Sequence, residues 1–521
     1  MVSAGYDLLV VGAGSAGIVL AVRAAQQGRR VLLLEAGDDY RSADVDPAWR
    51  SPNPVVALAD PTAAARFVWP DLTAARTTAQ ERRLYLRGRG AGGSSSVNAQ
   101  IAIRPPVEDF DDWMNTGCTG WSAADVLPYF AKLKDDREFG AADHHGVGGP
   151  IPVFRTPPSS WGAVDAALAR AAGTIGIPWA ADVNSPGAAG VSPYPINSRG
   201  GRRVSVNDAY LEPARSLANL VVRGNALVDT VVFNGERAVG VRIVRDGRVE
   251  TEYADQIALS AGVVHSPAIL LRSGVGPAEH MRALDLPVRS DLPVGEGLQD
   301  HPTALLSFPL RPEARPHTAH DRHTNVCIRS TSSDDAPALD LLFASLNQNV
   351  LAMATTGTGQ HSGVYSVWLN KPYSRGRLSL TSVDPTVQPT VDLRMLSDVR
   401  DLPRMRHGVR VLVDLARQDP TTAIAAGGLE VENAALLRVV DDDRALNGFL
   451  LATVGDAQHG TSTCRMGDPS DAHTVVDPSC RVLGTTRLSV VDASVFPSVP
   501  RANTNLATIM VGEVAADRLD R

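Results

Sequence analysis

The most constraining feature of the sequence is a glycine-rich turn that separates an apolar run from a helix-like stretch near the N-terminus. Its three glycines follow the pattern Gly-x-Gly-x-x-Gly and are Gly12, Gly14 and Gly17. The run Asp7 to Val11 precedes the turn, Gly17 to Gln27 has a helix-compatible composition, and Val31 to Leu34 is a second apolar run. The segment therefore predicts a βαβ unit.

In this context the three glycines predict a dinucleotide site. The first permits the tight turn, the second lets the backbone approach a pyrophosphate, and the third allows close packing of helix and strand. The helix N-terminus offers free N–H groups to the phosphate charge, so Ser15 and Ala16 are counted among the candidate contacts. Glu35, with Ala36 beside it, closes the second run. Its carboxylate can accept a hydrogen bond from a ribose 2′-hydroxyl, which disfavours NADP but does not decide between FAD and NAD.

Length and charge limit the class of protein. A chain of 521 residues exceeds what one hydrophobic core usually supports, so we expect two lobes that can be interleaved in sequence. The net charge of −7 and the lack of a Lys/Arg run argue against a nucleic-acid partner. The N-terminal residues do not resemble a signal peptide, and no apolar stretch is long enough to span a bilayer, so a cytoplasmic location is expected.

The cysteines do not predict a metal centre. The four of them are scattered, with no CxxC pair and no Cys/His cluster at ligand spacing. We therefore expect neither a disulfide scaffold nor a bound metal.

Strand-like patterns further along the chain predict two more sheet regions. Between about Asn219 and Ser260, short runs punctuated by Asn-Gly and Asp-Gly turns favour antiparallel hairpins. These runs are Leu220 to Val222, Val228 to Phe233, Val239 to Val244 and Gln256 to Leu259. The region from about Pro302 to Leu393 contains Val364 to Leu369 and Arg377 to Leu380, and it predicts a second sheet in a substrate-facing lobe.

Several longer segments resemble the signatures of the glucose-methanol-choline (GMC) oxidoreductase family, and together they extend from about Tyr6 to the end of the chain. They are Arg87 to Asn98, Ser260 to Pro277, Val294 to His301, His459 to Gly467 and Asn503 to Asn505. Within the family the chain looks most like the 5-hydroxymethylfurfural oxidase type, through segments such as Phe67 to Pro70 and Trp368 to Pro372.

The resemblance implies an α/β fold with a Rossmann-like FAD-binding domain assembled from several segments and a second, sheet-based (α+β) substrate domain. The first would comprise mainly residues 1–300, completed by 455–521, and the second mainly 301–454 with part of 150–200. Beyond the βαβ unit, the implied cofactor contacts are Ala91, Gly92, Gly93, Ser94, Asn98, Ala99, Val228, Asp492, Ala493, Thr504 and Asn505. Some members of the family tether FAD through a His where this chain has Val97, so non-covalent FAD is expected.

The resemblance also implies the catalytic residues. His459 matches the family's catalytic His, and a histidine that is mostly neutral near pH 7 suits proton abstraction from an alcohol. Asn503 stands where family members carry His or Asn, and its amide could hold the substrate oxygen. The sequence departs from the family at Ser462, where Gly is more usual, and at Gln458, which either contacts a polar substrate group or faces solvent. Structural roles are expected for His265, His301 and His473.

The function implied is oxidation of a primary alcohol to an aldehyde, with proton abstraction and hydride transfer to flavin N5. An aryl or furan alcohol is the favoured substrate and O2 the favoured acceptor. A dehydrogenase that passes electrons to a quinone or another carrier is one alternative. A hydroxynitrile lyase-like enzyme with non-redox FAD is another, and a non-catalytic flavin-binding protein is disfavoured by the pairing of His459 with Asn503.

Overall fold

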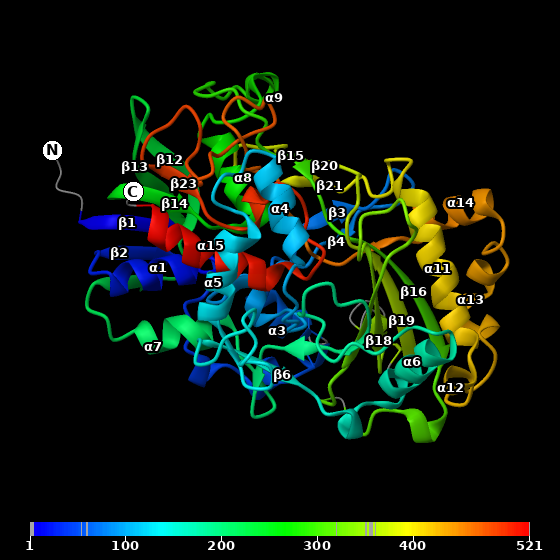
Figure 1. Cartoon of the computed structure of the whole chain (residues 1–521). Coiled ribbons are helices and arrows are strands. Elements are labelled where there is room, and N and C mark those ends of the chain that lie inside the picture. Colours follow the sequence, from blue (N-terminus) through cyan, green and yellow to red (C-terminus); the bar gives the residue numbers. More distant parts are fainter. Residues whose placement is uncertain are drawn as a thin grey trace.

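The computed structural model describes residues 5–53, 55–58, 61–318, 320–349, 352–353, 358–359 and 361–519. The first four residues of the predicted segment 1–300 and the last two of the predicted segment 455–521 lie outside this range. Figure 1 shows two lobes side by side, and the blue start of the first sheet lies beside the red C-terminal helix in the same lobe. The two ends of the chain therefore build one lobe together.

The first lobe contains a seven-stranded sheet. Its strand order is β11-β2-β1-β14-β13-β12, with β23 paired to β14. The strands are β1 (Tyr6–Val11), β2 (Val31–Leu34), β11 (Leu220–Arg223), β12 (Leu227–Asn234), β13 (Arg237–Arg245), β14 (Arg248–Leu259) and β23 (Leu488–Val490). β1 pairs in parallel with β2, and α1 (Gly17–Gln26) connects them, which confirms the predicted βαβ unit.

The antiparallel prediction for residues 219–260 is correct for β12, β13 and the first part of β14 but wrong for two runs. Leu220–Arg223 forms β11, which pairs in parallel with β2, and the end of β14 pairs in parallel with β1 and β23. The backbone N–H of Asn225 donates to Gly37 O at 2.8 Å, and that of Ala226 donates to Glu35 O at 2.9 Å. The chain after β11 thus follows the end of β2 instead of turning back into a hairpin.

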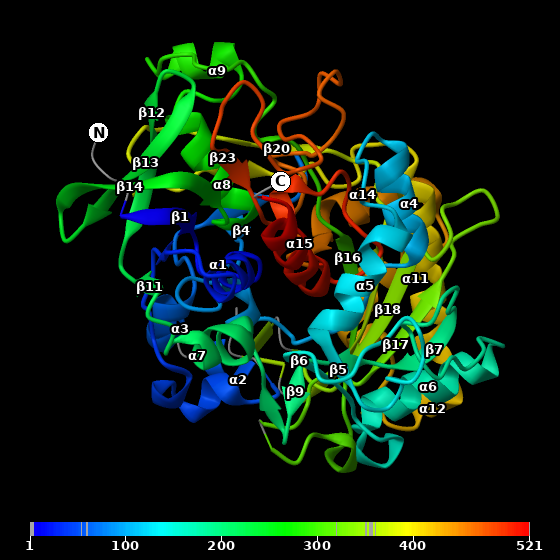
Figure 2. The same ribbon diagram turned by 60° about the vertical axis from the view of Figure 1, so that its left-hand side comes forward.

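Helix α15 (Thr504–Arg518) joins the C-terminus to the βαβ unit. It lies against α1 in both views (Figures 1 and 2), and it is buried over most of its length. Gly512 permits this approach, because a Cβ there would lie 2.8 Å from Ala16 O. An ion pair between Arg23 of α1 and Glu513 of α15, at 2.8 Å, also joins the two helices. The start of α15 is consequently placed beside the glycine-rich turn.

The second lobe contains a six-stranded sheet in the order β22-β16-β19-β18-β17-β7. Its strands are β7 (Gly190–Pro193), β16 (Pro302–Pro309), β17 (Val326–Ser330), β18 (Leu341–Leu346), β19 (Ser362–Leu369) and β22 (Gly455–Asp456). Its outer face is covered by α6 (Ala163–Thr174), α11 (Asp401–Arg417) and α13 (Glu430–Leu437), as Figure 1 shows. The opposite face presents Ala344, Leu346 and Trp368 to a cavity between the lobes.

One predicted strand of this second sheet belongs elsewhere. The run Arg377 to Leu380 corresponds to β20 (Gly376–Ser379), which lies in a five-stranded sheet ordered β15-β20-β21-β3-β4. The other strands of that sheet are β3 (Thr73–Ala75), β4 (Arg83–Leu84), β15 (Glu296–Leu298) and β21 (Thr390–Asp392). The strand lies in this sheet because β20 hydrogen-bonds to β15 on one side and to β21 on the other, and such long-range pairing carries no local sequence signal. The exact boundary between the lobes stays a prediction.

The remaining elements fill the space around these sheets. Two small sheets are formed by β5 (Lys134–Asp136), β6 (Ile151–Arg155) and β8 (Pro195–Ile196), and by β9 (Ser198–Arg199) and β10 (Arg202–Arg203). The other helices are α2 (Val55–Leu58), α3 (Pro61–Phe67), α4 (Val107–Asn115), α5 (Ala123–Leu133), α7 (Glu212–Ala214), α8 (Gly262–Arg272), α9 (Ala278–Ala283), α12 (Asp419–Thr422) and α14 (Asp443–Thr453). All four cysteines are buried free thiols. Within the described part of the chain, no helix combines the length and apolarity needed to cross a membrane.

Candidate active site

A cavity of about 340 Å³ is lined by residues of both lobes. It runs from the end of β2, past the glycine-rich turn, to the face of the six-stranded sheet that carries Trp368. Most of the candidate residues line it: Gly12, Gly14, Ser15, Ala16, Glu35, Ala36, Gly93, Ser94, Asn98, Ala99, Val228, His459, Asp492, Ala493, Asn503, Thr504 and Asn505. The structure therefore brings together residues that are separated by nearly the whole sequence.

Three of the candidate residues do not line the cavity. A Cβ on Gly17 would lie 2.0 Å from Gly12 O, so this glycine serves the close packing of α1 against the turn. Ala91 is fully buried, and its N–H donates to Asp38 O at 3.0 Å. Gly92 has a φ of +91° and donates to Ala13 O at 2.8 Å. Gly92 thus holds the segment Arg87 to Asn98 against the glycine-rich turn, and Ala91 holds it against the residues that follow β2.

The glycine-rich turn leaves room for a phosphate. At Gly12, φ is +102° and a Cβ would lie 2.5 Å from Ser260 O, so only glycine fits. At Gly14, by contrast, a Cβ would have its nearest neighbour, Ser260 O, at 3.9 Å, which leaves this side of the turn open to the cavity. The first turn of α1 contains no acidic side chain, and its N-terminal N–H groups lie at the cavity. The turn thus fits a dinucleotide pyrophosphate.

Glu35 is held in place by backbone N–H groups. Its Oε1 accepts from Gly37 and Gly90 at 2.9 and 2.8 Å, and its Oε2 accepts from Ala13 at 2.8 Å. Burial raises the pKa of the Glu35 carboxyl, while these three bonds oppose that rise. A carboxylate offers about four lone-pair positions, so Oε2 can still accept from a ribose hydroxyl.

The C-terminal candidate residues are linked to the first lobe by side-chain bonds. Ser15 Oγ donates to Asn505 Oδ1 at 2.9 Å. The Asp492 carboxylate accepts from Gly262 N at 2.9 Å and from Ser266 Oγ at 2.6 Å, which fixes it at the start of α8. Asn98 accepts from Arg203 through Oδ1 at 3.0 Å, and this leaves its Nδ2 hydrogens available to a ligand.

His459 lies after the edge strand β22, at the end of the cavity formed by the six-stranded sheet, and is 9% exposed. Asp300 fixes its backbone, because the carboxylate Oδ1 accepts from the N–H groups of both His459 and His301, at 2.8 and 2.7 Å. Tyr85 donates its hydroxyl to the other oxygen of Asp300 at 2.7 Å. Burial and the neighbouring Asp456 carboxylate raise the pKa of Asp300 to about 7. A buried carboxyl group therefore positions two histidines at once.

The two histidine rings are in direct contact, and their bonding fixes the tautomer of His459. His301 Nε2 lies 3.0 Å from Pro500 O, and His301 Nδ1 lies 2.9 Å from His459 Nδ1. The carbonyl can only accept, so His301 Nε2 carries the proton and its Nδ1 accepts. His459 Nδ1–H must then be the donor, which leaves the lone pair of a neutral His459 on Nε2.

Burial, the His301 ring and the charge of Arg87, in that order, hold the pKa of His459 well below its usual range. Burial likewise lowers the pKa of His301 to about 4. Both rings are consequently neutral near pH 7. Asn503 Nδ2 donates to His459 Nε2 at 3.0 Å, and Asn503 Oδ1 is buried without a partner among the described residues. The pair presents an acceptor nitrogen and an amide to the cavity, which is an arrangement able to take a hydroxyl proton and hold the oxygen.

Two departures from the family pattern have visible structural consequences. Ser462 has a φ of +74°, a left-handed backbone that glycine adopts without strain. Gln458 also has a positive φ, of +61°, and its carbonyl accepts from Arg87 Nη1 at 2.6 Å. Gln458 is exposed and lines the cavity, which is compatible with both alternatives for its side chain.

Sequence reasoning missed several residues that belong to the site. His301 was expected to be structural, yet it bonds directly to His459, and Trp368 packs edge-on against the His459 ring at 5.7 Å between centroids. His265 lines the cavity and stacks on Trp69 at 4.2 Å. The sequence offered one weak signal for the contact between His301 and His459. Asp300 directly precedes His301, and a buried carboxylate can accept hydrogen bonds from the backbone of a distant segment. His473 is exposed and is not among the residues that line the described cavity.

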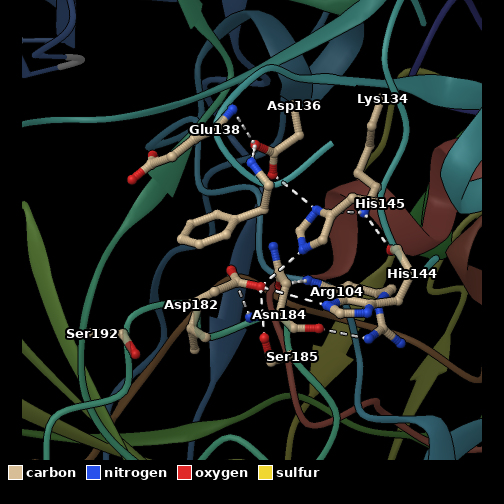
Figure 3. Close-up of polar contacts among 12 residues, drawn as sticks. Arg104, Lys134, Asp136, Glu138, His144, His145, Asp182, Asn184, Ser185 and Ser192 are labelled. Carbon is tan, nitrogen blue, oxygen red and sulfur yellow. Dashed lines mark hydrogen bonds and ion pairs between the residues drawn. The ribbon is translucent and has the colours of Figure 1, made fainter. Parts of the chain in front are cut away.

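One group of side chains outside this cavity has the spacing of a metal site. His144, His145 and Asp182 place ligand atoms within 4.8 Å of one another (Figure 3). Both ring nitrogens of His145 are already bonded to carboxylates, to Asp136 at 2.9 Å and to Asp182 at 2.8 Å. Arg155 pairs with both of these acids at 3.0 and 2.9 Å.

Nearby cations further disfavour a metal in this group. Lys134 Nζ lies 3.4 Å from His145 Nδ1, and burial followed by the charge of Arg104 lowers the pKa of Lys134 to about 7. Arg155 bonds to both carboxylates, and together with Lys134 and Arg104 it offsets their negative charge, so little is left to attract a further cation. The group is a buried ion-pair network that joins β5, β6 and the loop containing Asp182.

Comparisons with known proteins agree with this geometry. A family model described as GMC oxidoreductase matches residues 6–303, and a second model with the same description matches residues 372–512. The chain is 34% identical to 5-(hydroxymethyl)furfural oxidase of Methylovorus sp. (strain MP688), over 99% of this chain and 98% of that protein. It is also 34% identical to the mitochondrial choline dehydrogenase of Homo sapiens, over 98% of this chain and 89% of that protein.

Solved structures share the fold. Pyridoxine 4-oxidase from Mesorbium loti superposes with a TM-score of 0.87 at 25% identity, covering 99% of each chain. An Aspergillus oryzae formate oxidase superposes with a TM-score of 0.86 at 21% identity, covering 99% of this chain and 98% of that chain.

Proposed function

Because this chain belongs to the GMC oxidoreductase family, whose members act on CH–OH donors and depend on FAD, we propose that it oxidises a primary alcohol to an aldehyde. The favoured substrate is an aryl or furan alcohol, and the favoured acceptor is O2. The observation that carries the proposal is the neutral His459 Nε2, unprotonated and bonded to Asn503 at 3.0 Å, at one end of a cavity that fits a dinucleotide.

The cofactor would be held by three parts of the first lobe. The open turn at Gly14 and the α1 N-terminus would take the pyrophosphate, Glu35 the ribose, and the segments around Asn98 and Asp492 the flavin end. Val97 lines the cavity where some relatives carry a tethering His, and its side chain has no atom that could form such a bond. We therefore propose non-covalent FAD, which acid denaturation should release into the supernatant.

In this mechanism the chain supplies the base and the orientation. The substrate hydroxyl replaces the Asn503 N–H at the lone pair of His459 Nε2, which then accepts the hydroxyl proton. Asn503 Nδ2 donates to the substrate oxygen and keeps it in place. FAD, when bound, would supply the two-electron acceptor for the hydride from the substrate carbon. His301 stabilises the protonated His459 ring, because the Nδ1–H donor already has an acceptor at 2.9 Å.

Similarity to the furfural oxidase supports the proposed substrate and acceptor, and the apolar walls of the cavity suit a ring. Ile101, Ala344, Leu346 and Trp368 provide those walls. An enzyme that passes electrons to a quinone or another carrier is the contrasting possibility, since the relatives include choline dehydrogenases. The cytoplasmic location expected from the sequence remains part of the proposal.

The test is anaerobic addition of furan, aryl, aliphatic and quaternary-ammonium alcohols to the purified flavoprotein, followed by readmission of air. Loss of the oxidised flavin absorbance on addition of an alcohol would support alcohol oxidation. Rapid recovery in air with formation of peroxide would support O2 as the acceptor, and slow recovery would favour a carrier. A flavoprotein that no alcohol bleaches would contradict the proposal and would favour a lyase.

A further inference from the structure

Asn503 follows an irregular segment, residues 496–502, that separates the short helical turn Ala493–Val495 from α15. Because the segment forms neither helix nor strand, the position of the Asn503 amide, 3.0 Å from His459 Nε2, depends on bonds to other parts of the chain. Misplacing a reacting group by about 1 Å can lower a rate about 100-fold. The groups that hold this segment therefore influence how well Asn503 can act.

The middle of the segment is held by the residues that follow β15. Val499 N donates to Gln299 Oε1 at 3.0 Å, and Pro500 O accepts from His301 Nε2 at 3.0 Å. These two bonds leave the last residues before Asn503 to be fixed by a different part of the chain.

Arg501, two residues before Asn503, is fixed by Asp109 on α4. Asp109 Oδ2 accepts from the Arg501 backbone N–H at 2.6 Å, and Asp109 Oδ1 accepts from Arg501 Nε at 3.0 Å. One carboxylate thus binds both the backbone and the side chain of the same residue. Arg501 Nη1 donates to Ala338 O at 2.7 Å, and Arg329 Nη2 adds a longer bond to Arg501 O, at 3.2 Å. Asp109 is fully buried and Arg501 is 4% exposed, so water has little access to these bonds.

A second cation joins the same carboxylate to the start of the segment. Lys371, which follows β19, donates through Nζ to Asp109 Oδ1 at 2.8 Å and to Ser498 Oγ at 3.2 Å. Although burial raises the pKa of Asp109, the charges of Lys371 and Arg501 lower it overall, so the carboxylate is ionised near pH 7. Hydrogen bonds between charged groups are shorter and stronger than neutral ones. Asp109 therefore holds the segment both at Ser498 and at Arg501.

Asp109 is not among the residues that line the described cavity, whereas Asn503 and His459 are. We propose that Asp109 is a positioning residue, which through its bonds to the segment before Asn503 sets the distance between the Asn503 amide and His459 Nε2. It acts on the reaction through Asn503 and touches neither the alcohol nor the flavin. The kinetic consequence of this inference rests on the proposed function, whereas the bond between Asn503 and His459 exists without turnover.

The kinetic test is a double-mutant cycle between Asp109 and Asn503, read out as the anaerobic reduction of the flavin by a saturating aryl or furan alcohol. We expect Asp109→Ala to lower the rate of reduction about 10- to 100-fold, because Asn503 is no longer held beside the base. In an Asn503→Ala background the same substitution should lower the rate less than about twofold, since the group that it displaces is already absent. An equal loss in both backgrounds, or no loss in Asp109→Ala alone, would overturn the inference.

Asp136→Ala is the matched control for the loss of a buried acid. Asp136 is fully buried like Asp109, and its carboxylate pairs with Arg155 at 3.0 Å and with His145 at 2.9 Å, in the network shown in Figure 3. Removal of this carboxylate should lower the Tm, because it leaves a buried cation without its partner, but should leave the rate of flavin reduction within about twofold of wild type. A loss as large as that of Asp109→Ala would contradict the inference.

A second variant covers the case in which Asp109→Ala does not fold. That substitution leaves the Lys371 and Arg501 cations without their carboxylate. In Asp109→Ala/Lys371→Met one of the two cations is removed, and Arg501 keeps Asp112 as a partner at 3.7 Å. The rate of flavin reduction should again fall about 10- to 100-fold, and a wild-type rate in this variant would overturn the inference.

Nitrogen NMR of the FAD-loaded protein, labelled with ¹⁵N-histidine, tests the inference without turnover. The Nε2 signal of His459, identified by its loss in His459→Gln, depends on the hydrogen bond from Asn503. We expect this signal to move in Asp109→Ala toward its position in Asn503→Ala, and to stay in place in Asp136→Ala. If the signal moves in this way but no alcohol reduces the flavin, the proposed function fails and the inference stands. A signal that keeps its wild-type position in Asp109→Ala would overturn the inference, whether or not an alcohol is oxidised.

Discussion

Replacing His301 should impair catalysis without touching the substrate. In His301→Ala the His459 Nδ1–H loses the acceptor that lies at 2.9 Å and remains buried. An unsatisfied buried donor costs about 1–3 kcal/mol, and each 1.36 kcal/mol is a factor of ten in rate, so kcat/KM should fall roughly 5- to 150-fold. The freed ring can also adopt the other tautomer, which would place the proton on Nε2 and remove the base.

His301→Asn is the matched variant, because the asparagine side-chain oxygen can take over the role of the accepting Nδ1. Its kcat/KM should fall less than about tenfold, since that oxygen retains most of the bond to His459. Both variants are assayed by anaerobic stopped-flow reduction of the flavin, with thermal unfolding to confirm that they fold. Equal losses in the two variants, or no loss in His301→Ala, would refute the tautomer assignment.

Three further predictions follow from the local structure. Because the pKa of His459 is held well below its ordinary value of 6.5, the ring is still neutral at pH 6.5. The acidic limb of kcat/KM should therefore lie below pH 6.5, and a midpoint above pH 7 would contradict this. Ser462→Gly relieves a left-handed backbone and should raise the unfolding free energy by about 0.5–1 kcal/mol in thermal denaturation, whereas a lower Tm would count against it. Asp182→Asn removes a partner of both Arg155 and His145 and should cost about 3–5 kcal/mol in denaturant unfolding. Although burial raises the pKa of Asp182, its bond to His145 and the charge of Arg155 lower it overall, so the wild-type stabilisation should be present above about pH 4 and lost as pH falls further; a pH-independent difference between the two proteins would be inconsistent.

The sequence was sufficient to predict the elements whose residues carry their own local signal. The turn from Gly12 to Gly17 carries local limits, a φ of +102° at Gly12 and the 2.0 Å that a Cβ on Gly17 would leave to Gly12 O. The short apolar runs around it have the length of buried strands. The parallel pairing of β11 was not predictable in this way, because it depends on bonds from Asn225 and Ala226 to the distant end of β2.

His459 and its contact with His301 differ in the same respect. His459 stands within a motif, whereas the contact between His459 and His301 joins residues 158 positions apart.

The measurement that tests the central claim most directly is anaerobic flavin reduction in the wild-type protein and in His459→Gln, with a saturating aryl or furan alcohol. The wild-type flavin should bleach. The flavin of the variant, which lacks the base, should be reduced at least about 100-fold more slowly. A wild-type flavin that no alcohol reduces, or a His459→Gln variant that is reduced at the wild-type rate, would contradict the assignment of His459 as the base in an alcohol-oxidising enzyme.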